Sequence, residues 1–554
     1  MRLSAQGVLT LFKILALAGG CMAQARADIR DFGADGTDGL DDSAAFSAAA
    51  AAVLGAGGGE VFVPSGEELS PGVFQTFVFH IGAQVSVTVP SGKQISILGD
   101  APSSTVKALP GATGSMLFFV VEGDARLEVS SLTLNGNGAD PAQPSGARTL
   151  RITGTGGVGD PSEIRVSGCK FEDQVFVSLT LWGGDSFENT RAHVDSCLFV
   201  GGRKGVNELG WPNDPRYVEV GNGAEVTIKS CYFDTLHSGA DRSFDPGISG
   251  VITTRSVQEE PIPFSTLIVS SCVFRGVGRF ADGNNSIGCV DMYARTRGSI
   301  VSGNRFLDCR YTAVRGKSCI DGLVVSANTV DKSHADGIQV TPVASQPYFN
   351  GGAVVIHGNT IQDVGRRGIH YSGGDQQDIA AASNVLIRNN NIARAWSSGI
   401  SVTRAQDVSV IDNVLDSVSI EEKGVGVISG IHITEVIGGI LVAGNNISQV
   451  GEARQTGSLP AAILVQGQGT VTNALVVSNR IRSSIHRGVV AADLNYTRVV
   501  GNSLGLPGTP SGVAFSGVNM DFMMVQGNIN SGYAASLSLA SVSVLKESGN
   551  SWNP

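Results

Sequence analysis

A short phrase recurs along the chain from residue 166 to its end, and its spacing constrains the fold more than any other feature. Each copy places a cysteine or an asparagine three residues after a Val or Ile that opens the phrase. The shared position is occupied by Cys169, Cys197, Cys231, Cys272, Asn304, Asn328, Asn359, Asn390, Asn413, Asn445, Asn479, Asn502 and Asn528. Successive copies lie 23 to 41 residues apart, the period of stacked supersecondary units. We therefore expect a solenoid, in which each coil contacts mainly its neighbours.

The composition suits such a fold. The chain has 73 glycines, while charged residues make up 16% and aromatic residues 6% of it. This balance favours short strands joined by tight bends over helical bundles or disorder. The formal net charge of −10 argues against binding to nucleic acid or to an anionic membrane. An acidic polysaccharide would need a local basic patch or a bridging cation.

The repeated phrase also predicts the interior of each coil. An apolar residue stands two positions after each of the first eleven of these residues: Phe171, Phe199, Phe233, Phe274, Phe306, Val330, Ile361, Ile392, Leu415, Ile447 and Ile481. Parallel coils stack about 4.8 Å apart, so these side chains should form one internal column. The asparagines should form a second column whose amides bond along the stack, because an unpaired buried amide costs about 1–3 kcal/mol. We interpret the asparagines as structural.

A second phrase, Gly-Ile-x-Val-x, alternates with the first at 337–341, 368–372, 399–403 and 430–434, and residues 289–293 and 313–317 fit its register. Alternate residues of a strand face opposite sides, so the third and fifth positions should face solvent. Stacking aligns the third positions as Asp291, Arg315, Gln339, His370, Ser401 and His432, and the fifth as Tyr293, Lys317, Thr341, Ser372, Thr403 and Thr434. Titratable residues are confined to the middle coils, which predicts a functional cleft there.

The amino-terminal segment has a different pattern. Asp42 or Ser43 can cap an alanine-rich helix from about residue 44 to residue 54, which Gly55 ends. A strand then runs to Pro64. The first coil of a solenoid has an uncovered apolar end, so we expect this helix to act as its cap.

The same segment carries a longer motif. Its residues are Asp31-Phe-Gly-Ala34, Asp41-Asp42, Ala45, Gly57-Gly-Gly59, Val61-Phe-Val-Pro64 and Gly66, followed by Ile95-Ser-Ile-Leu-Gly99. The motif resembles the amino-terminal signature of the pectate-lyase-like superfamily. The resemblance implies an all-β fold: a single-stranded right-handed parallel β-helix with an amino-terminal capping helix. It implies one continuous domain, with the cap and first coils in residues 28–110 and further coils in residues 111–554. Lyases, polygalacturonase-like hydrolases, uronan epimerases and phage tailspikes share this signature.

Residues 1–27 are expected to be an export signal, with Arg2 near the start, an apolar stretch and then small residues. Cleavage would follow Ala25-Arg-Ala27 or Ala23-Gln-Ala25. Cys21 offers lipoprotein anchoring as an alternative. No later run reaches the roughly 18 apolar residues of a membrane span. The protein is therefore expected in the periplasm or outside the cell.

The cleft residues suit β-elimination on a polymer that contains uronic acid. This reaction needs a cation for the C6 carboxylate, a base for the C5 proton and an acid for the leaving oxygen. The resemblance implies Lys or Arg as the base and Ca²⁺ or Arg as the neutralising cation. The catalytic candidates are Lys317 as the base, Arg315 as a carboxylate clamp, Tyr293 or His370 as the acid, and Asp291. The substrate-binding candidates are Arg295, Arg297, Gln339, Trp211 and Arg367.

Other functions stay open at this point. Hydrolysis needs two carboxylates about 5–10 Å apart, and the available pairs are Asp291 with Asp336 and Asp241 with Asp245. A uronan C5-epimerase is another alternative, although Gly247 replaces the histidine of its Asp-Pro-His motif. A non-catalytic adhesin or carbohydrate-binding protein would instead spread aromatic and amide groups along the whole solenoid.

The sequence implies no certain cofactor. Ca²⁺ is a candidate ligand, because Asp282-Gly-Asn-Asn285 supplies oxygen ligands without the full EF-hand spacing. Seven cysteines follow the expected signal with no CxxC spacing, so zinc is not expected. Packing is their default role, and disulfides between adjacent coils stay open. The expected partner is a polysaccharide, acidic if the protein is a lyase.

Overall fold

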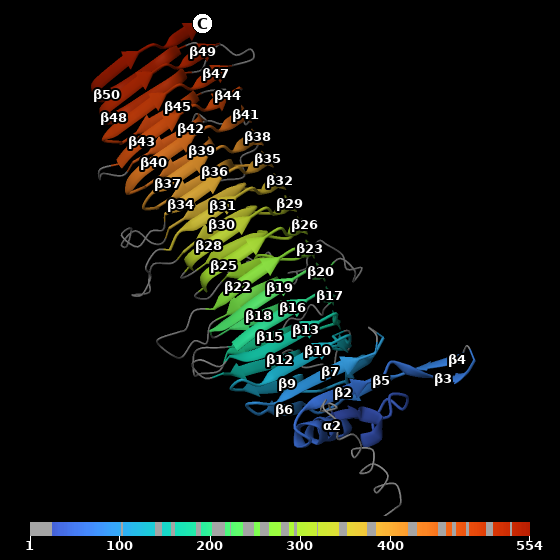
Figure 1. Cartoon of the computed structure of the whole chain (residues 1–554). Helices are drawn as coiled ribbons and strands as arrows, with labels where there is room; N and C mark the ends of the chain where they lie inside the picture. The colour runs from blue at the N-terminus through green and yellow to red at the C-terminus, as the bar shows by residue number, and fades with distance from the viewer. Residues whose placement is uncertain are drawn as a thin grey trace, which may run out of the picture. The chain divides into compact units, whose positions relative to one another are not determined.

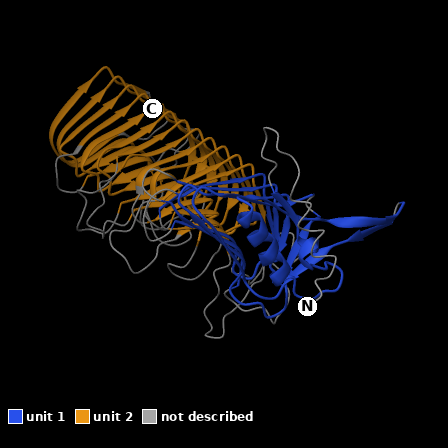
Figure 2. Cartoon of the chain, turned by 60° about the horizontal axis from the view of Figure 1, so that its bottom comes forward, with its two compact units in different colours: residues 1–213, 223–225 blue, residues 214–222, 226–554 orange. Residues whose placement is uncertain are grey.

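The structure is a computed structural model in which the fold is a right-handed parallel β-helix with one short α-helix near its amino terminus. The described residues are 25–71, 73–100, 103–138, 147–156, 161–183, 190–201, 216–221, 223–235, 249–254, 265–278, 287–292, 296–317, 320–342, 352–373, 384–418, 429–451, 461–467, 472–482, 487–505, 513–531 and 535–553. They fall into two compact units, residues 1–213 with 223–225 and residues 214–222 with 226–554 (Figure 2). The predicted fold class is confirmed, and the single continuous domain stays a prediction.

Unit 1 contains three stacks of parallel strands. The first is β6 (Val85–Val89), β9 (Ser115–Glu122), β12 (Arg148–Thr155) and β15 (Val177–Gly183). The second is β1 (Ala25–Asp28), β2 (Gly59–Val63), β7 (Gln94–Gly99), β10 (Arg126–Ser130), β13 (Ser162–Ser167) and β16 (Thr190–Asp195). The third is β5 (Val78–Ile81), β8 (Thr105–Ala108), β11 (Thr133–Asn135), β14 (Lys170–Glu172) and β17 (Leu198–Val200).

The amino-terminal helix packs on the first strands of unit 1. A short 3-10 helix, η1 (Ile29–Phe32), precedes α2 (Ser43–Gly55). The buried face of α2 includes Phe46 and Val53, and the helix contacts β1, β2, β6 and β7 (Figure 1). Asp42 occupies the N-cap without a side-chain capping bond, because its carboxylate accepts the backbone N–H groups of residues 35 and 80 instead. An antiparallel hairpin, β3 (Gly66–Ser70) with β4 (Val73–Thr76), completes the unit.

Unit 2 also contains three stacks. Stack A is β18 (Arg216–Gly221), β21 (Ser249–Thr254), β24 (Val290–Met292), β27 (Val314–Lys317), β30 (Ile338–Thr341), β33 (Ile369–Ser372), β36 (Ser398–Thr403), β39 (Ser429–Thr434), β42 (Ala461–Gln466) and β45 (Arg487–Ala492). Stack B is β19 (Ala224–Lys229), β22 (Thr266–Ser270), β25 (Thr296–Ser302), β28 (Ile320–Ser326), β31 (Val354–His357), β34 (Val385–Arg388), β37 (Val408–Ile411), β40 (Gly438–Ala443), β43 (Thr472–Val477) and β46 (Tyr496–Val500). The longer strands β48 (Val513–Gln526) and β50 (Ala535–Ser548) pair with the last members of both stacks.

Stack C follows the bend that the repeated phrase forms. Its strands are β20 (Tyr232–Asp234), β23 (Val273–Arg275), β26 (Arg305–Cys309), β29 (Thr329–Ser333), β32 (Thr360–Val364), β35 (Asn391–Ala395), β38 (Val414–Val418), β41 (Asn446–Val450), β44 (Arg480–Ile481), β47 (Ser503–Gly505), β49 (Ile529–Ser531) and β51 (Ser551–Asn553). The residue before each asparagine turns the chain in the left-handed region, for example Ala327 at φ 53° and Gly358 at φ 65°. This conformation lets stack B turn sharply into stack C.

The internal columns form as predicted. Phe233, Phe274 and Phe306 are fully buried, and adjacent rings stack with centroids 4.6 Å and 4.9 Å apart. Within unit 1, the rings of Phe171 and Phe199 stack at 4.7 Å. The described cysteines that follow residue 168 are buried, which is consistent with a packing role.

The asparagine column is a continuous hydrogen-bonded ladder in unit 2. Each amide Nδ2 donates to the Oδ1 of the next asparagine and to a stack B carbonyl, as Asn390 does to Asn413 at 2.9 Å and to Ile356 at 3.0 Å. Each backbone N–H donates to the same Oδ1, as at Asn359, whose N–H donates to Asn390 at 3.0 Å. The ladder extends one coil further than the sequence indicated, to Asn550. These hydrogen bonds join neighbouring coils, as expected if the asparagines have a structural role.

Removing one member of this ladder should destabilise the fold. In Asn390→Leu, the Asn359 N–H and the Ile356 carbonyl lose the partners described above, so we expect the free energy of unfolding to fall by about 2–3 kcal/mol. Denaturant unfolding followed by circular dichroism measures the change. Asn391→Leu is the matched control, because Asn391 is the next residue and is exposed; its effect should stay within about 0.5 kcal/mol. Equal effects of the two substitutions would show that the ladder contributes nothing.

Candidate functional site

The predicted register of stack A is confirmed. Strand pairing aligns Asp291 with Arg315, Arg315 with Gln339, Gln339 with His370, His370 with Ser401, and Ser401 with His432. The prediction that this column faces solvent is wrong for much of it. Asp291 is 0%, Arg315 5%, His370 9% and Ser401 3% exposed. These side chains bury one another and leave Gln339 and His432 partly accessible.

A buried ion pair anchors one end of the column. The Arg315 guanidinium lies 2.7 Å from Asp291 Oδ2, with both side chains almost completely shielded. The same carboxylate oxygen accepts the backbone N–H of Gly288 at 2.9 Å. The guanidinium also lies over the ring of Tyr311, 5.8 Å from its centroid. Arg315 is therefore held in place and is less free to clamp a substrate than the sequence suggested.

Lys317 lies two residues after Arg315 on the same face of β27, and it is half-buried. Burial lowers the pKa of its amine, the nearby Arg315 guanidinium lowers that pKa further, and Asp291 opposes the shift. A lowered pKa increases the fraction of neutral amine at a given pH. The Lys317 amine is therefore partly accessible and loses its proton at a lower pH than the amine of an exposed lysine.

The bends that precede the stack A strands add a second group of residues. Asp336 is fully buried, and its Oδ1 accepts the backbone N–H of Arg367 at 3.0 Å. Burial lowers the pKa of the Arg367 guanidinium, which Asp336 opposes, and the neighbouring Arg366 lowers it too. Burial raises the pKa of Tyr311, against the effect of Arg315. Tyr311 therefore keeps its phenolic proton over a wider pH range than an exposed tyrosine.

The histidines of the column are neutral near pH 7. Burial lowers the pKa of His370 to about 4, Arg367 and Arg366 contribute to the fall, and Asp336 opposes it. Burial also lowers the pKa of His432 to about 4, with a contribution from Arg367. A neutral imidazole is a poor proton donor, so the assignment of His370 as the acid loses support.

Several polar atoms of this group have no hydrogen-bond partner among the described residues. They are Asp291 Oδ1, Asp336 Oδ2, Gln339 Oε1 and His370 Nδ1. Buried polar atoms are normally satisfied, so these four atoms keep hydrogen-bonding capacity for water or another group. The accessible surface of the site consists of Lys317, Gln339, Tyr311, Arg366 and Arg367.

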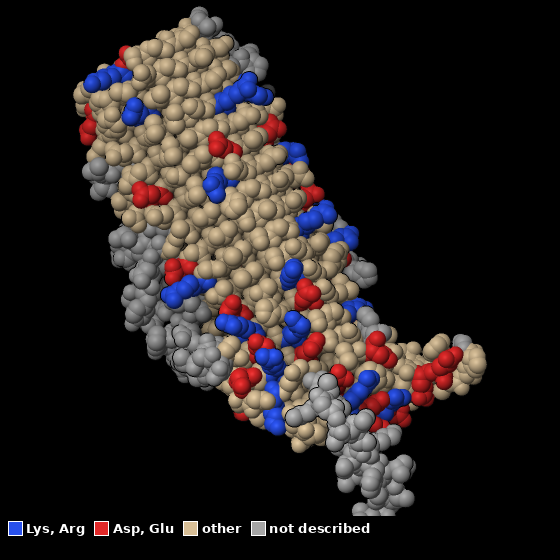
Figure 3. All heavy atoms as spheres, viewed as in Figure 1, with Lys and Arg blue, Asp and Glu red and all other residues tan. Residues whose placement is uncertain are grey.

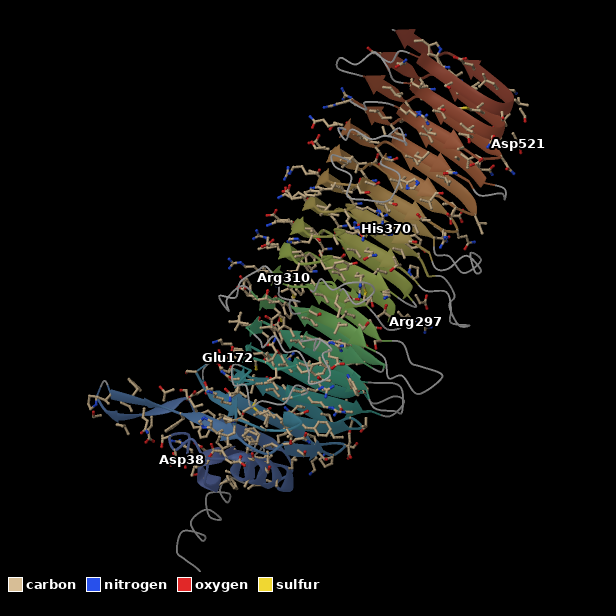
Figure 4. All side chains as sticks on the ribbon, turned by 180° about the vertical axis from the view of Figure 1, so that it is seen from behind. Asp38, Glu172, Arg297, Arg310, His370 and Asp521 are labelled. Carbon is tan, nitrogen blue, oxygen red and sulfur yellow. The ribbon has the colours of Figure 1, made fainter. Side chains whose placement is uncertain are left out.

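The remaining candidates separate from this group. Tyr293, Arg295 and Trp211 lie outside the described residues, as do Asp241, Asp245 and the segment 279–286. Arg297 belongs to β25 in stack B, where it pairs with Asp321 at 2.8 Å. Figure 4 shows Arg297 apart from His370. The structure therefore does not bring Arg297 into the site, because its strand follows the corner between stacks A and B.

Sequence reasoning missed Tyr311. Tyr311 lies in the bend before β27, at the position that Ala335 and Arg366 occupy before β30 and β33. Backbone hydrogen bonds link these equivalent positions: the Ala335 N–H donates to the Tyr311 carbonyl, and the Arg366 N–H donates to the Ala335 carbonyl. Extending the predicted phrase two residues toward the amino terminus, from 313 to 311, would have found it. Across the described ranges, no three His, Cys, Asp or Glu residues are placed to hold a metal ion. In the same part of the chain, no helix is long and apolar enough to span a membrane.

No family model and no curated protein match this sequence. Several solved β-helix structures are similar over most of the chain. The catalytic unit of a GH87 α-1,3-glucanase from Streptomyces thermodiastaticus shows 13% identity and a TM-score of 0.34, covering 97% of this chain and 70% of that one. The A-module of the mannuronan C-5 epimerase AlgE6 from Azotobacter vinelandii shows 14% identity and a TM-score of 0.24, covering 95% and 99%. The Streptococcus pneumoniae adhesin PfbA shows 14% identity and a TM-score of 0.31, covering 94% and 93%. These similarities concern the fold alone.

Proposed function

We propose that this chain is an exported polysaccharide lyase that cleaves a polymer containing uronic acid by β-elimination. The observation that carries the proposal is the environment of Lys317. Its amine is half-buried beside the fixed Arg315 guanidinium, and both features lower its pKa. Abstraction of a proton from carbon needs an unprotonated base, and the lowered pKa increases the fraction of neutral Lys317 amine at a given pH.

The bends that precede the stack A strands offer candidates for the other two requirements of the reaction. Arg367, with Arg366 beside it, can neutralise the C6 carboxylate, because Arg315 is already paired with Asp291. Lys317 takes the C5 proton, the C4–O4 bond breaks as the C4=C5 double bond forms, and O4 leaves with a proton. Tyr311 is the proposed donor of that proton, because its raised pKa keeps it protonated.

Hydrolysis is the second candidate, supported by the buried pair Asp291 and Asp336. Each carboxylate keeps one oxygen without a hydrogen-bond partner in the described part of the chain. The two lie two coils apart, a spacing of about 10 Å along the stack, near the upper limit for an inverting pair. Both side chains are 0% exposed, whereas Lys317 and Arg367 are accessible. Accessibility therefore favours elimination.

An epimerase would share the first step, because it also removes the C5 proton. It would return a proton to the opposite face of the sugar without breaking the C4–O4 bond. A non-catalytic protein of this fold would bind the polymer and release no product. Product analysis separates all of these functions.

The test is incubation of the purified protein with polygalacturonate, alginate and bacterial exopolysaccharides, with Ca²⁺ and with a chelator in parallel. A lyase produces unsaturated ends that absorb near 235 nm. New reducing ends without this absorbance identify a hydrolase, and a changed uronate ratio at constant chain length identifies an epimerase. Either of these last two outcomes, or binding without products, would overturn the lyase proposal.

Export is part of the proposal. Strand β1 begins at Ala25 and pairs with β2 in register from Ala25 with Gly59 to Asp28 with Phe62. Cleavage after Ala27 would remove most of this strand, whereas cleavage after Ala25 would retain Arg26, whose guanidinium lies 4.0 Å from the centre of the Phe62 ring. We therefore place the mature amino terminus at Arg26. Mass spectrometry of the exported protein would check the cleavage site.

A further inference from the structure

A shallow groove lies on stack B, over strands β37, β40, β43 and β46. It has a volume of about 690 Å³, within the range of about 300–1,000 Å³ that ligand sites span. Its lining includes Leu441, Leu475, Asn473, Tyr496 and Arg498. None of these residues belongs to the stack A site. Figure 3 shows the face that carries stack B as mostly uncharged surface with isolated charged groups.

The groove exposes apolar side chains that a strand would ordinarily turn inward. Thr497 and Val499 of β46 are completely buried. Side chains alternate between the two faces of a strand, so Tyr496 and Arg498 point outward. Leu475 points outward from β43 in the same way, between the buried Ala474 and Val476. Pairing aligns Asn473 with Tyr496 and Leu475 with Arg498 across adjacent coils. Clustered outward apolar groups on a solenoid indicate a binding surface.

An aromatic shelf borders the groove. The rings of Tyr496 and Phe522 stack in parallel, 4.5 Å apart with an interplanar angle of 2°. Tyr496 is 37% exposed. A flat, exposed ring with a polar tip can stack against the apolar face of a sugar ring while its hydroxyl bonds to a sugar hydroxyl. The shelf therefore favours a glycan over a small apolar ligand.

Two basic groups, Arg498 and Lys546, lie beside this shelf. Arg498 lies one position beyond Tyr496 on the outward face, and the Lys546 ammonium lies 5.8 Å from the centre of the Phe522 ring. The acidic member of the lining, Asp407, accepts the Gly439 N–H at 2.7 Å and lies at the other end of the groove. Cations next to a stacking surface complement a sugar that carries a carboxylate.

We propose that this groove is a second carbohydrate-binding site, specific for acidic glycans, in which Tyr496 stacks on a sugar ring and Arg498 binds its carboxylate. The site lies on a different stack from Lys317 and does not depend on the proposed elimination. It would hold the polymer on the protein independently of the residues that act on it.

The test is affinity electrophoresis in native gels that contain polygalacturonate, with dextran as the neutral polymer. Each variant is made in a Lys317→Met background so that the polymer stays intact. We expect Tyr496→Ala to weaken binding about five- to tenfold and Tyr496→Phe to retain it. Arg498→Ala should weaken binding to polygalacturonate, and the binding that remains should depend less on the salt concentration. Dextran should cause little retardation of any variant.

Arg480→Ala is the matched control for Arg498→Ala, because Arg480 is also exposed but belongs to stack C. It should bind polygalacturonate as the parent does. Unchanged retardation of both Tyr496→Ala and Arg498→Ala would overturn the proposal, and equal retardation by dextran would overturn the acidic specificity. This test does not depend on the proposed elimination. Retardation that depends on Tyr496, in a protein that forms no unsaturated products, would still support glycan binding in the groove.

Discussion

Lys317→Met should lower kcat on the identified polymer by about 10²–10⁴-fold, the usual contribution of a general base. The substitution removes the amine but keeps an unbranched side chain at the same half-buried position. In the unsubstituted protein, the rate should rise with pH as Lys317 loses its proton. The midpoint should lie below the value of about 10.4 for an exposed lysine, because burial and Arg315 lower the pKa of Lys317. Initial rates of absorbance change near 235 nm across pH measure both effects.

Lys332→Met is the control for this prediction. Lys332 lies on stack C, is exposed and pairs with Asp308 at 3.0 Å. Its replacement should leave both kcat and the pH midpoint unchanged. If Lys317→Met kept more than about a tenth of the activity, Lys317 would not be the base.

Arg315→Met should reduce the free energy of unfolding by about 3–5 kcal/mol, because it leaves the Asp291 carboxylate buried without its cation. The ion pair is almost fully shielded, so water cannot replace the lost partner. The double variant Asp291→Asn/Arg315→Met should recover most of the loss. Its asparagine removes the buried charge and keeps an acceptor for the Gly288 N–H. Denaturant unfolding of the two variants measures this recovery.

Arg297→Met provides the matched comparison. Arg297 and Asp321 form a pair of nearly the same length, 2.8 Å, but their side chains are 61% and 33% exposed. Solvent screens such a pair, so its loss should cost less than about 1 kcal/mol. Similar losses from the Arg297 and Arg315 variants would mean that burial does not determine the importance of the Asp291–Arg315 pair.

The repeated phrase predicted the fold because its asparagines and its apolar residues each make the same kind of contact in every coil. The asparagine amides need partners along the stack, and the ladder from Asn304 to Asn550 supplies them. The phenylalanines need an apolar interior, and their rings stack inside the coil. Local pattern and tertiary packing agree at these positions, so the repeat spacing is enough to predict the register of the coils.

The same register placed Asp291, Arg315, Gln339 and His370 in one column correctly. It could not show how deeply each would be buried. Strand alternation distinguishes the inward from the outward face, but exposure depends on what neighbouring side chains cover. Arg315 is outward and still almost fully buried against Asp291 and Tyr311.

The solenoid, its asparagine and phenylalanine columns and the alignment of the central titratable residues all follow from the amino-acid pattern. A periodic pattern carries that information because every coil repeats the same contacts. The accessibility of the aligned residues emerges only in the folded chain, as does the Tyr496–Phe522 shelf on stack B. Burial, pKa and ring stacking depend on side chains from different coils, which no single repeat encodes.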